Sequence, residues 1–268
     1  MRVIGHVAVN VFKESVRDKI LYNLVFFAVL LISASYLIGE LTAGQDVKII
    51  KDLGLASISV FGLLIAIFIG IGLVWKEVEK RSIYTLLSKP MRRQEFLLGK
   101  YFGLVLTLII NVSVMTAAFY ALLAYIQVTS PPNVRAAWAA PATDPAMLKA
   151  IVLIMLELML VTAIALLFST FSSPFLSAML TMAVWVIGHF NADLRDYGAT
   201  ISSPIAASLA RAIYYVVPNF AAFDIKLQSV HAQPVALRYI GLTSAYGLAY
   251  VALVLLAAVI IFSKRDFK

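Results

Sequence analysis

The sequence predicts an all-α membrane protein with six transmembrane helices and both ends of the chain in the cytoplasm. Of its 268 residues, 62% are hydrophobic and only 13% are charged, far from the balance of a water-soluble domain of this length. The apolar residues gather in six runs near the length of roughly 20 residues that a helix needs to cross a bilayer. The Lys and Arg residues lie mainly at the ends of these runs, so the net charge of +8 reflects membrane orientation and predicts no nucleic-acid partner.

The predicted spans follow one another along the whole chain, and the fifth is the shortest. They are Leu21–Leu41, Leu53–Trp75, Tyr101–Ile126, Leu148–Phe168, Phe175–Phe190 and Tyr239–Phe262. With the N-terminus inside, the cytoplasmic segments hold fourteen of the 22 Lys and Arg residues. The basic C-terminal tail then requires an even number of crossings, which argues against a seventh span.

The first twenty residues predict a helix that lies in the inner membrane interface. Apolar residues between Val3 and Val16 repeat at nearly helical spacing, and charged residues gather towards the end of the segment. These charges also interrupt any apolar core of a cleavable signal peptide, so we expect the mature chain to begin near Met1. The alternative is a helical extension of the first span that stands in the cytosol.

The extracytoplasmic connection at residues 191–238 is too apolar for an ordinary solvated loop. Its stretch Ser203–Phe223 has one charged residue, Arg211, and contains Pro218. This pattern predicts a short re-entrant helix before the sixth span, near a translocation path or at its outer end. A helix resting on the outer leaflet is the alternative. The other outer loop, Gln127–Ala146, contains four prolines and is expected to be irregular.

Motifs for catalysis, metal binding and nucleotide binding are missing from the sequence. It has no cysteine, and it contains no GxxxxGK[ST], HExxH or GxSxG pattern. His189 and Asp193 are one helical turn apart, but a histidine satisfied at the membrane interface is the simpler interpretation. Gly62, Gly70 and Gly72 lie within a span and predict close helix packing. We therefore expect no catalytic residue, no metal site, no cofactor and no ATP hydrolysis by this chain alone.

Two polar residues within spans are candidates for a translocation path. Glu157 is the one carboxylate well inside a span, where an ionised acid costs on the order of 3 kcal/mol. It therefore needs a partner, a proton or water. It either lines a path or bonds across a subunit interface, or it is protonated and bonded to a hydroxyl of a neighbouring helix. Asn111 is a weaker candidate, because hydrogen bonds between membrane helices are common in packing.

The polar stretch Lys76–Lys100 lies on the cytoplasmic side, between the second and third spans, and contains seven Lys or Arg residues. Its first part predicts an amphipathic helix that continues the second span. Pro90 breaks this helix and can begin the next one. Beyond it, apolar residues alternate with Arg92, Arg93 and Glu95, which gives a face able to enter a groove on a partner. A solvated loop that only sets topology is the alternative.

The segment EVEKRSIYTLLSKPMRRQEFLLGK in this stretch is similar to the cytoplasmic segment of ABC-2 type transporter permeases. The matching positions are Glu77, Glu79, Arg81, Leu86, Leu87, Pro90, Arg93, Glu95, Gly99 and Lys100. The segments VRDKILYNLVFF, ELTAGQDVKIIKDLGLASISVFG and FSKRDF also resemble the branch that includes the nitrous-oxide-reductase maturation permease. The resemblance covers essentially the whole chain, so residues 1–268 are expected to form one transmembrane domain.

The resemblance implies a permease subunit in a prokaryotic inner membrane, with a coupling helix between the second and third spans. The implied coupling residues are Glu77, Glu79, Arg81, Pro90, Arg92, Arg93 and Glu95. The implied partners are two copies of a separate ATP-binding subunit, which bind ATP and Mg, and a second permease subunit, either identical or a close paralogue. Periplasmic accessory proteins are a further implied partner, and export is the expected direction.

The substrate class stays open, because the family includes members for polysaccharides, lipids, drugs, peptides and the maturation of periplasmic copper enzymes. A self-sufficient channel or ion-coupled carrier is the alternative function. Such a protein should have more ionisable residues at mid-membrane than Glu157 alone. A membrane enzyme is a third class, for which the sequence offers no adequate group of residues.

Overall fold

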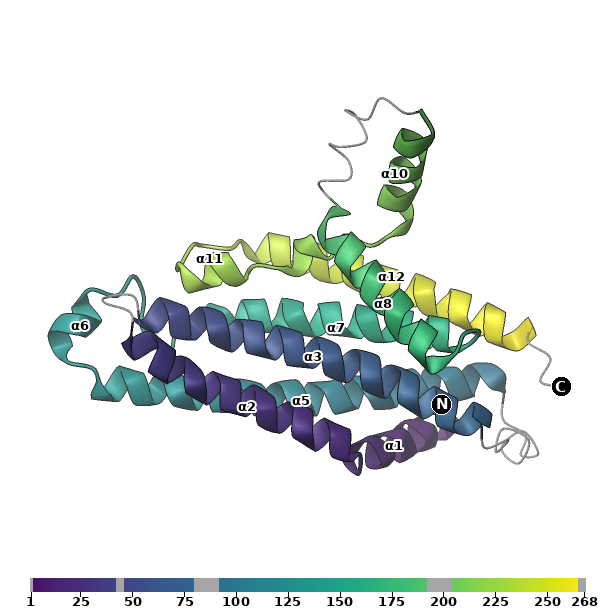
Figure 1. Cartoon of the computed structure of the whole chain (residues 1–268), viewed down its shortest axis with the longest axis horizontal. Helices are drawn as coiled ribbons and strands as arrows, with labels where there is room; N and C mark the ends of the chain where they lie inside the picture. Colours follow the sequence, from purple (N-terminus) through teal and green to yellow (C-terminus); the bar gives the residue numbers. More distant parts are fainter. Residues whose placement is uncertain (1, 42–45, 80–91, 192–203, 265–268) are drawn as a thin grey trace.

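The computed structural model describes residues 2–41, 46–79, 92–191 and 204–264, and every regular element within these ranges is a helix. The predicted all-α fold class is therefore confirmed for the described chain. The long helices run along the long axis of the molecule (Figure 1). These are α2 (Lys19–Glu40), α3 (Asp46–Glu79), α5 (Arg93–Thr129), α7 (Met147–Ser169) and α12 (Leu237–Lys264).

These five helices are long and apolar enough to cross a membrane, and they match five of the six predicted spans. The fifth predicted span corresponds to α8 (Pro174–His189), which has 16 residues. At 1.5 Å per residue it is about 24 Å long, short of a hydrocarbon core of about 30 Å. A sixth candidate span exists only if the helices Ile205–Val216 and Ala221–Val230, bent by 44° at their junction, count as one crossing.

Helices α3 and α7 pack closely at the centre of the bundle, and glycines permit this approach. A Cβ atom at Gly62 would lie 2.5 Å from Leu158 Cδ1, and one at Gly70 would lie 3.3 Å from Ala165 Cβ. Leu158 and Ala165 are both fully buried on α7. The packing role predicted for these two glycines of α3 is confirmed, because small residues let membrane helices come close.

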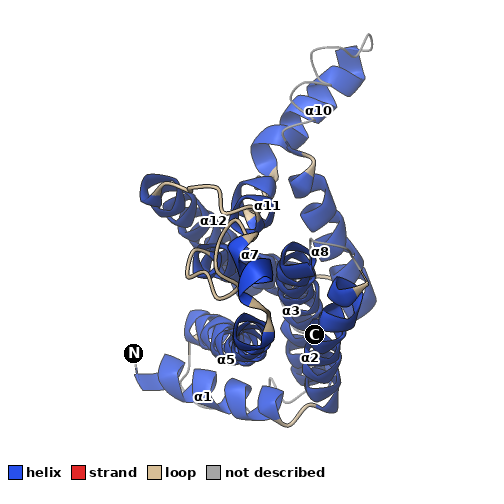
Figure 2. Ribbon diagram, turned by 90° about the vertical axis from the view of Figure 1, so that its left-hand side faces the viewer, coloured by secondary structure: helices blue, strands red, loops and turns tan. Residues whose placement is uncertain are grey.

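The N-terminal helix α1 (Arg2–Val16) is separate from the first span and crosses the start of α5 at a large angle (Figure 2). A Cβ atom at Gly99 would lie 2.6 Å from Val7 Cβ, and one at Gly103 would lie 2.6 Å from the Ala8 carbonyl oxygen. Asp18 caps α2, because its side chain accepts a hydrogen bond of 3.0 Å from the Ile20 amide. The chain therefore turns between α1 and α2, and α1 does not simply extend the first span.

At the opposite end of the bundle lie the short helices α6 (Pro132–Ala136) and α11 (Lys226–Val230) (Figure 1). Lys51 of α3 ties down the loop after α6, because its Nζ donates to the Pro141 carbonyl oxygen at 2.8 Å.

The predicted helix around Arg211 is present as α10 (Pro204–Val216), which stands away from the bundle in both views. The 3-10 turn η1 (Ala221–Phe223) and α11 then bring the chain back onto α7. Whether α10 re-enters the bilayer or rests on its surface stays a prediction.

Candidate functional site

The predicted coupling residues that the structure describes with side chains lie at the start of α5. The Glu95 carboxylate accepts a hydrogen bond of 3.2 Å from the Arg92 amide, which satisfies a free N–H group at the helix start. Arg93 donates from Nη1 to the carbonyl oxygens of Ser263, at 3.0 Å, and Phe262, at 3.4 Å. These carbonyls belong to the last turn of α12, where a cation is favoured by the helix dipole.

Aromatic contacts strengthen this junction between α5 and α12. The rings of Phe96 and Phe262 stack with centroids 6.2 Å apart, and Lys100 Nζ lies 4.9 Å from the Phe96 centroid. Lys100 is only 1% exposed. Because Gly99 in the same turn contacts α1, the start of α5 joins α1 and α12 in one packed unit.

The remaining predicted coupling residues are only partly placed. Glu77 and Glu79 lie in the last turn of α3, of which the structure describes the backbone. Arg81 and Pro90 lie outside the described residues, as does the predicted break in the coupling segment. Helix α5 begins at Arg93. Arg92 lies just before the helix, and its side chain is exposed.

The two candidates for a translocation path have different surroundings. Asn111 of α5 is 6% exposed and donates from Nδ2 to the Thr107 carbonyl oxygen of its own helix at 2.7 Å. Glu157, at the midpoint of α7, is 2% exposed and accepts a hydrogen bond from another helix. In the described part of the chain, each of these two residues therefore bonds to a different partner.

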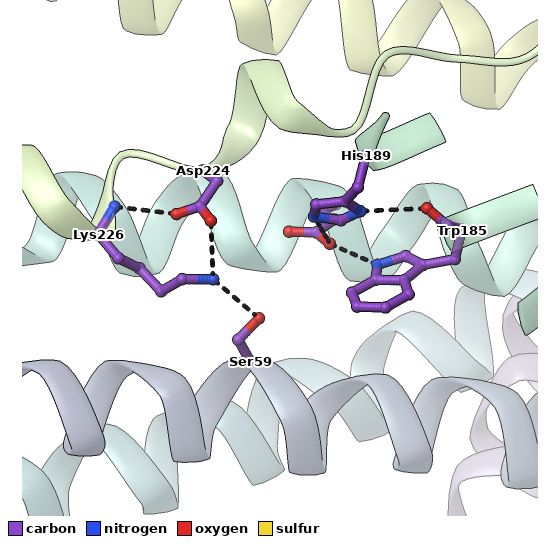
Figure 3. Close-up of polar contacts among 6 residues, drawn as sticks. Ser59, Trp185, His189, Asp224 and Lys226 are labelled. Atoms are coloured by element: carbon purple, nitrogen blue, oxygen red, sulfur yellow. Dashed lines mark hydrogen bonds and ion pairs between the residues drawn. The ribbon is translucent and has the colours of Figure 1, made fainter. Parts of the chain in front are cut away.

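Glu157 belongs to a group of polar side chains that we name the mid-span cluster. Its members come from α3, α7, α8 and the segment around η1 and α11, and five of them are labelled in Figure 3. They are Ser59, Glu157, Trp185, His189, Asp224 and Lys226. The cluster brings four ionisable side chains to one place within the bundle.

The first half of the cluster joins α7 to α8. The Trp185 indole Nε1–H donates to Glu157 Oε1 at 2.7 Å, and His189 Nε2 lies 3.7 Å from the same oxygen. The register follows from the short turn between these antiparallel helices, because both Glu157 and Trp185 lie about twelve residues from it. His189 follows Trp185 by one helical turn and therefore faces the same side of α8.

The second half of the cluster belongs to the segment that returns from α10. Lys226 Nζ lies 3.3 Å from Asp224 Oδ2 and 3.5 Å from Ser59 Oγ of α3. Asp224 also accepts a hydrogen bond of 3.1 Å from the Lys226 amide through Oδ1, which fixes the turn that presents this ion pair (Figure 3). The pair therefore ties the returning segment to α3.

The returning segment closes over the end of α8. The Phe220 amide donates to the Gly188 carbonyl oxygen at 3.0 Å, and the Phe220 ring stacks on His189 with centroids 5.9 Å apart. A Cβ atom at Gly188 would lie 2.5 Å from the Pro218 carbonyl oxygen, so a glycine is needed for this approach. Asn191 adds a hydrogen bond of 2.8 Å to the Val217 carbonyl oxygen.

An apolar groove of about 580 Å³ opens beside the cluster, between α3 and α8. Its lining consists of Leu64, Ile67, Phe68, Ala178, Met179, Met182, Ala183, Val186 and Ile187. None of these side chains is charged, so the groove suits an apolar group or another helix rather than an ion. The cluster residues are not part of this lining.

Sequence reasoning identified Glu157 but missed its partners. It considered His189 with Asp193, which lies outside the described residues, and it treated Asp224 and Lys226 as part of an outer loop. Two signals were available: the short fifth span, and a charged pair in a connection already expected to re-enter the bilayer. Among the described residues, no group of three or more Asp, Glu or His side chains could hold a metal ion.

The model of a family described as "ABC-2 family transporter protein" matches residues 6–267. No curated protein matches the chain. The matched range includes every helix from α2 to α12 and most of α1.

Proposed function

Because the chain belongs to the ABC-2 family of transporter proteins, we propose that it is the membrane-spanning permease subunit of an ATP-driven exporter. The family match over nearly the whole chain carries this proposal, and the five or six candidate spans are what such a subunit needs. We place it in a prokaryotic inner membrane with both termini in the cytoplasm. Catalysis is assigned to a separate subunit, because this chain has no phosphate-binding loop of its own.

The proposed partners are two copies of an ATP-binding subunit, which hold ATP and Mg, and a second permease that is identical or a close paralogue. The start of α5 is where we expect the ATP-binding subunit to act. Arg93 connects this turn to the end of α12, and Gly99 connects it to α1. A displacement there would move three helices together, which is how differential contacts can shift a transporter between two states.

The substrate is the least constrained part of the proposal. Likeness to the branch that includes the nitrous-oxide-reductase maturation permease favours a role beside periplasmic accessory proteins. A gene for an ATPase with a phosphate-binding loop next to this gene would support the transporter. Neighbouring genes for a copper enzyme would support that branch, and neighbouring genes for polysaccharide or lipid synthesis would contradict it.

One observation favours an ion-coupled carrier as the second candidate. The mid-span cluster contains Glu157, His189, Asp224 and Lys226, whereas the sequence had indicated only one ionisable residue at this depth. Reconstituted vesicles distinguish the two functions. Transport that needs ATP and the ATP-binding subunit supports the exporter, and transport driven by a pH gradient without them supports the carrier.

The first experiment is purification of the chain from its native membrane in mild detergent, with mass spectrometry and an ATPase assay on the product. We expect a phosphate-loop ATPase to co-purify, because the family works with such a subunit. Arg92→Gln should lower its recovery several-fold, since Arg92 is exposed beside α5. The matched control is Arg238→Gln, which removes the same charge at the opposite end of the bundle.

Arg93→Gln tests the same surface with a different expectation. This variant should reduce ATPase recovery and also loosen the end of α12, because it removes the Arg93 guanidinium group that donates to the carbonyl oxygens of Phe262 and Ser263. A protein that purifies alone, and shows no ATPase association in any variant, would contradict the permease proposal.

A further inference from the structure

The position of His189 restricts where its hydrogens can lie. Its Nδ1 lies 3.1 Å from the Trp185 carbonyl oxygen. A carbonyl oxygen only accepts hydrogen bonds, so Nδ1 carries a hydrogen and donates it. In a neutral imidazole, Nε2 is then an acceptor without a hydrogen.

The atom that faces this nitrogen is also an acceptor when ionised. Glu157 Oε1 lies 3.7 Å from His189 Nε2. An ionised carboxylate has no hydrogen, so a neutral His189 would place its lone pair opposite one on a carboxylate that is only 2% exposed. The Trp185 N–H satisfies Oε1 from another side and does not relieve this conflict.

The net charge of the cluster also indicates that Glu157 and His189 hold an additional proton. In the mid-span cluster, the ionisable groups around Glu157 are His189 of α8 and Asp224 and Lys226 of the returning segment, and α3 contributes the hydroxyl group of Ser59. Lys226 is paired with Asp224 at 3.3 Å. Without an additional proton, the cluster would therefore have a net charge of about −1, with the uncompensated charge on Glu157, which is 2% exposed at the midpoint of a spanning helix.

We propose that Glu157 and His189 form a proton-binding site that holds one proton on either Oε1 or Nε2, which lie 3.7 Å apart. The pair is then a carboxylate beside an imidazolium, or a neutral carboxyl group beside a neutral imidazole. Both forms replace the opposed lone pairs by one attractive contact and make the cluster neutral. This inference does not depend on the permease proposal.

The bound proton has a mechanical consequence. It fastens the end of α8 to the middle of α7, and Phe220 covers the imidazole from the returning segment. A movement that separates α8 from α7 would break the shared contact, so it must release the proton or admit water. The site therefore links the proton concentration to the position of α8.

The direct test counts protons in the wild-type site. In a His6→Gln, His231→Gln background, His189 is the only histidine, so its ring nitrogens can be followed at neutral pH by ¹⁵N NMR. Infrared spectra of this protein and of its Glu157→Gln variant identify the carboxyl band of Glu157. We expect either a doubly protonated His189, or a neutral His189 together with a protonated-carboxyl band that disappears in Glu157→Gln. A neutral His189 without such a band overturns the proposal.

A second measurement tests the link to α8. In a Trp75→Phe, Trp138→Phe background, Trp185 is the only tryptophan of the chain. Its ring centroid lies 4.4 Å from that of His189. We expect its emission to change when alkali removes the proton. Glu157→Gln should abolish this change, because an amide carries no charge and so neither releases a proton itself nor holds one on His189.

The matched control is Asp144→Asn, which makes the same carboxylate-to-amide change in the outer loop Gln127–Ala146 and leaves the mid-span cluster unchanged. It should retain the alkaline change in Trp185 emission. The same alkaline change in Glu157→Gln as in the unmodified pair would overturn the proposal, because the emission would then report another group.

Discussion

At the scale of single residues, the most consequential hydrogen bond is that from the Trp185 indole to Glu157. It joins two helices at 2.7 Å, and it is the shortest contact that Glu157 makes in the cluster. Loss of the indole donor would leave this buried acceptor unsatisfied. The side chain of Trp185 therefore positions Glu157.

We predict that Trp185→Phe destabilises the protein by about 1–3 kcal/mol, the range for a buried group left without its partner. Thermal unfolding in detergent measures this effect. Trp138→Phe makes the same chemical change in the outer loop, at a partly buried ring, and is expected to cost less. Equal losses in the two variants would show that ring size, and not the bond to Glu157, determines the stability of this site.

The sequence singles out Glu157 because a carboxylate inside an apolar run is visible in one dimension, and its place in a translocation path stays a prediction. Its partners were not visible, since the contact depends on the register of α7 against α8 and on a segment that returns from α10. The contacts of Arg93 were also not visible in the sequence, because they join segments that are far apart in the chain. The sequence showed a cationic, partner-facing turn, whereas the structure also gives Arg93 two bonds to the end of α12.

At the scale of elements, close crossings between helices depend on glycines at helical spacing. Gly99 and Gly103, one helical turn apart on α5, bring the backbone of α1 close. This spacing is the small-residue pattern that lets membrane helices pack at short distance. The sequence resemblance had assigned Gly99 to a coupling motif, and the structure adds a packing reason for a small residue there.

We predict that Gly103→Ala destabilises the protein by about 1–3 kcal/mol, because the new methyl group would lie 2.6 Å from the Ala8 carbonyl oxygen and must push α1 away. Unfolding in detergent, followed by circular dichroism, measures this loss. Gly241→Ala is the matched control, since nothing lies within 4 Å of its new methyl group on α12. This control should be neutral or stabilising by up to about 1 kcal/mol, from helix propensity alone. A neutral Gly103→Ala would mean that α1 is free to shift.

Five of the six predicted spans and the N-terminal helix agree with the structure, because long apolar runs and helical spacing are strong local signals. The fifth span was harder to predict. Its residues are apolar throughout, but α8 ends at His189, where Pro218 and Phe220 of a distant segment meet Gly188. This end is set by tertiary contacts, which local composition does not reveal.

At the scale of the whole molecule, α1, the start of α5 and the end of α12 lie at one end, and α6 and α11 lie at the other (Figure 1). The two ends of the chain are thus on the same side of the bundle, which fits an even number of crossings. The excess of Lys and Arg in the segments of the first end predicts that this end faces the cytoplasm.

Single cysteines test this orientation cleanly, because the chain has no cysteine of its own. We predict that a membrane-impermeant maleimide labels Ala139→Cys, in the loop after α6, in intact cells. Ser173→Cys, in the turn between α7 and α8, should react only after the membrane is permeabilised. Both positions are exposed in the structure, so access to solvent is matched. Reversed labelling would place the basic end outside.

The short length of α8 has a consequence for the surrounding lipid. A helix that ends about 6 Å short of a normal hydrocarbon core creates hydrophobic mismatch, which bilayers relieve by thinning locally or by recruiting protein. The far leaflet next to α8 must therefore be compressed, or it must be replaced by polypeptide. Because Pro218 and Phe220 pack against Gly188 at the end of α8, polypeptide replaces part of this leaflet. A polar group beside α8 would then cross less hydrocarbon than elsewhere around the subunit.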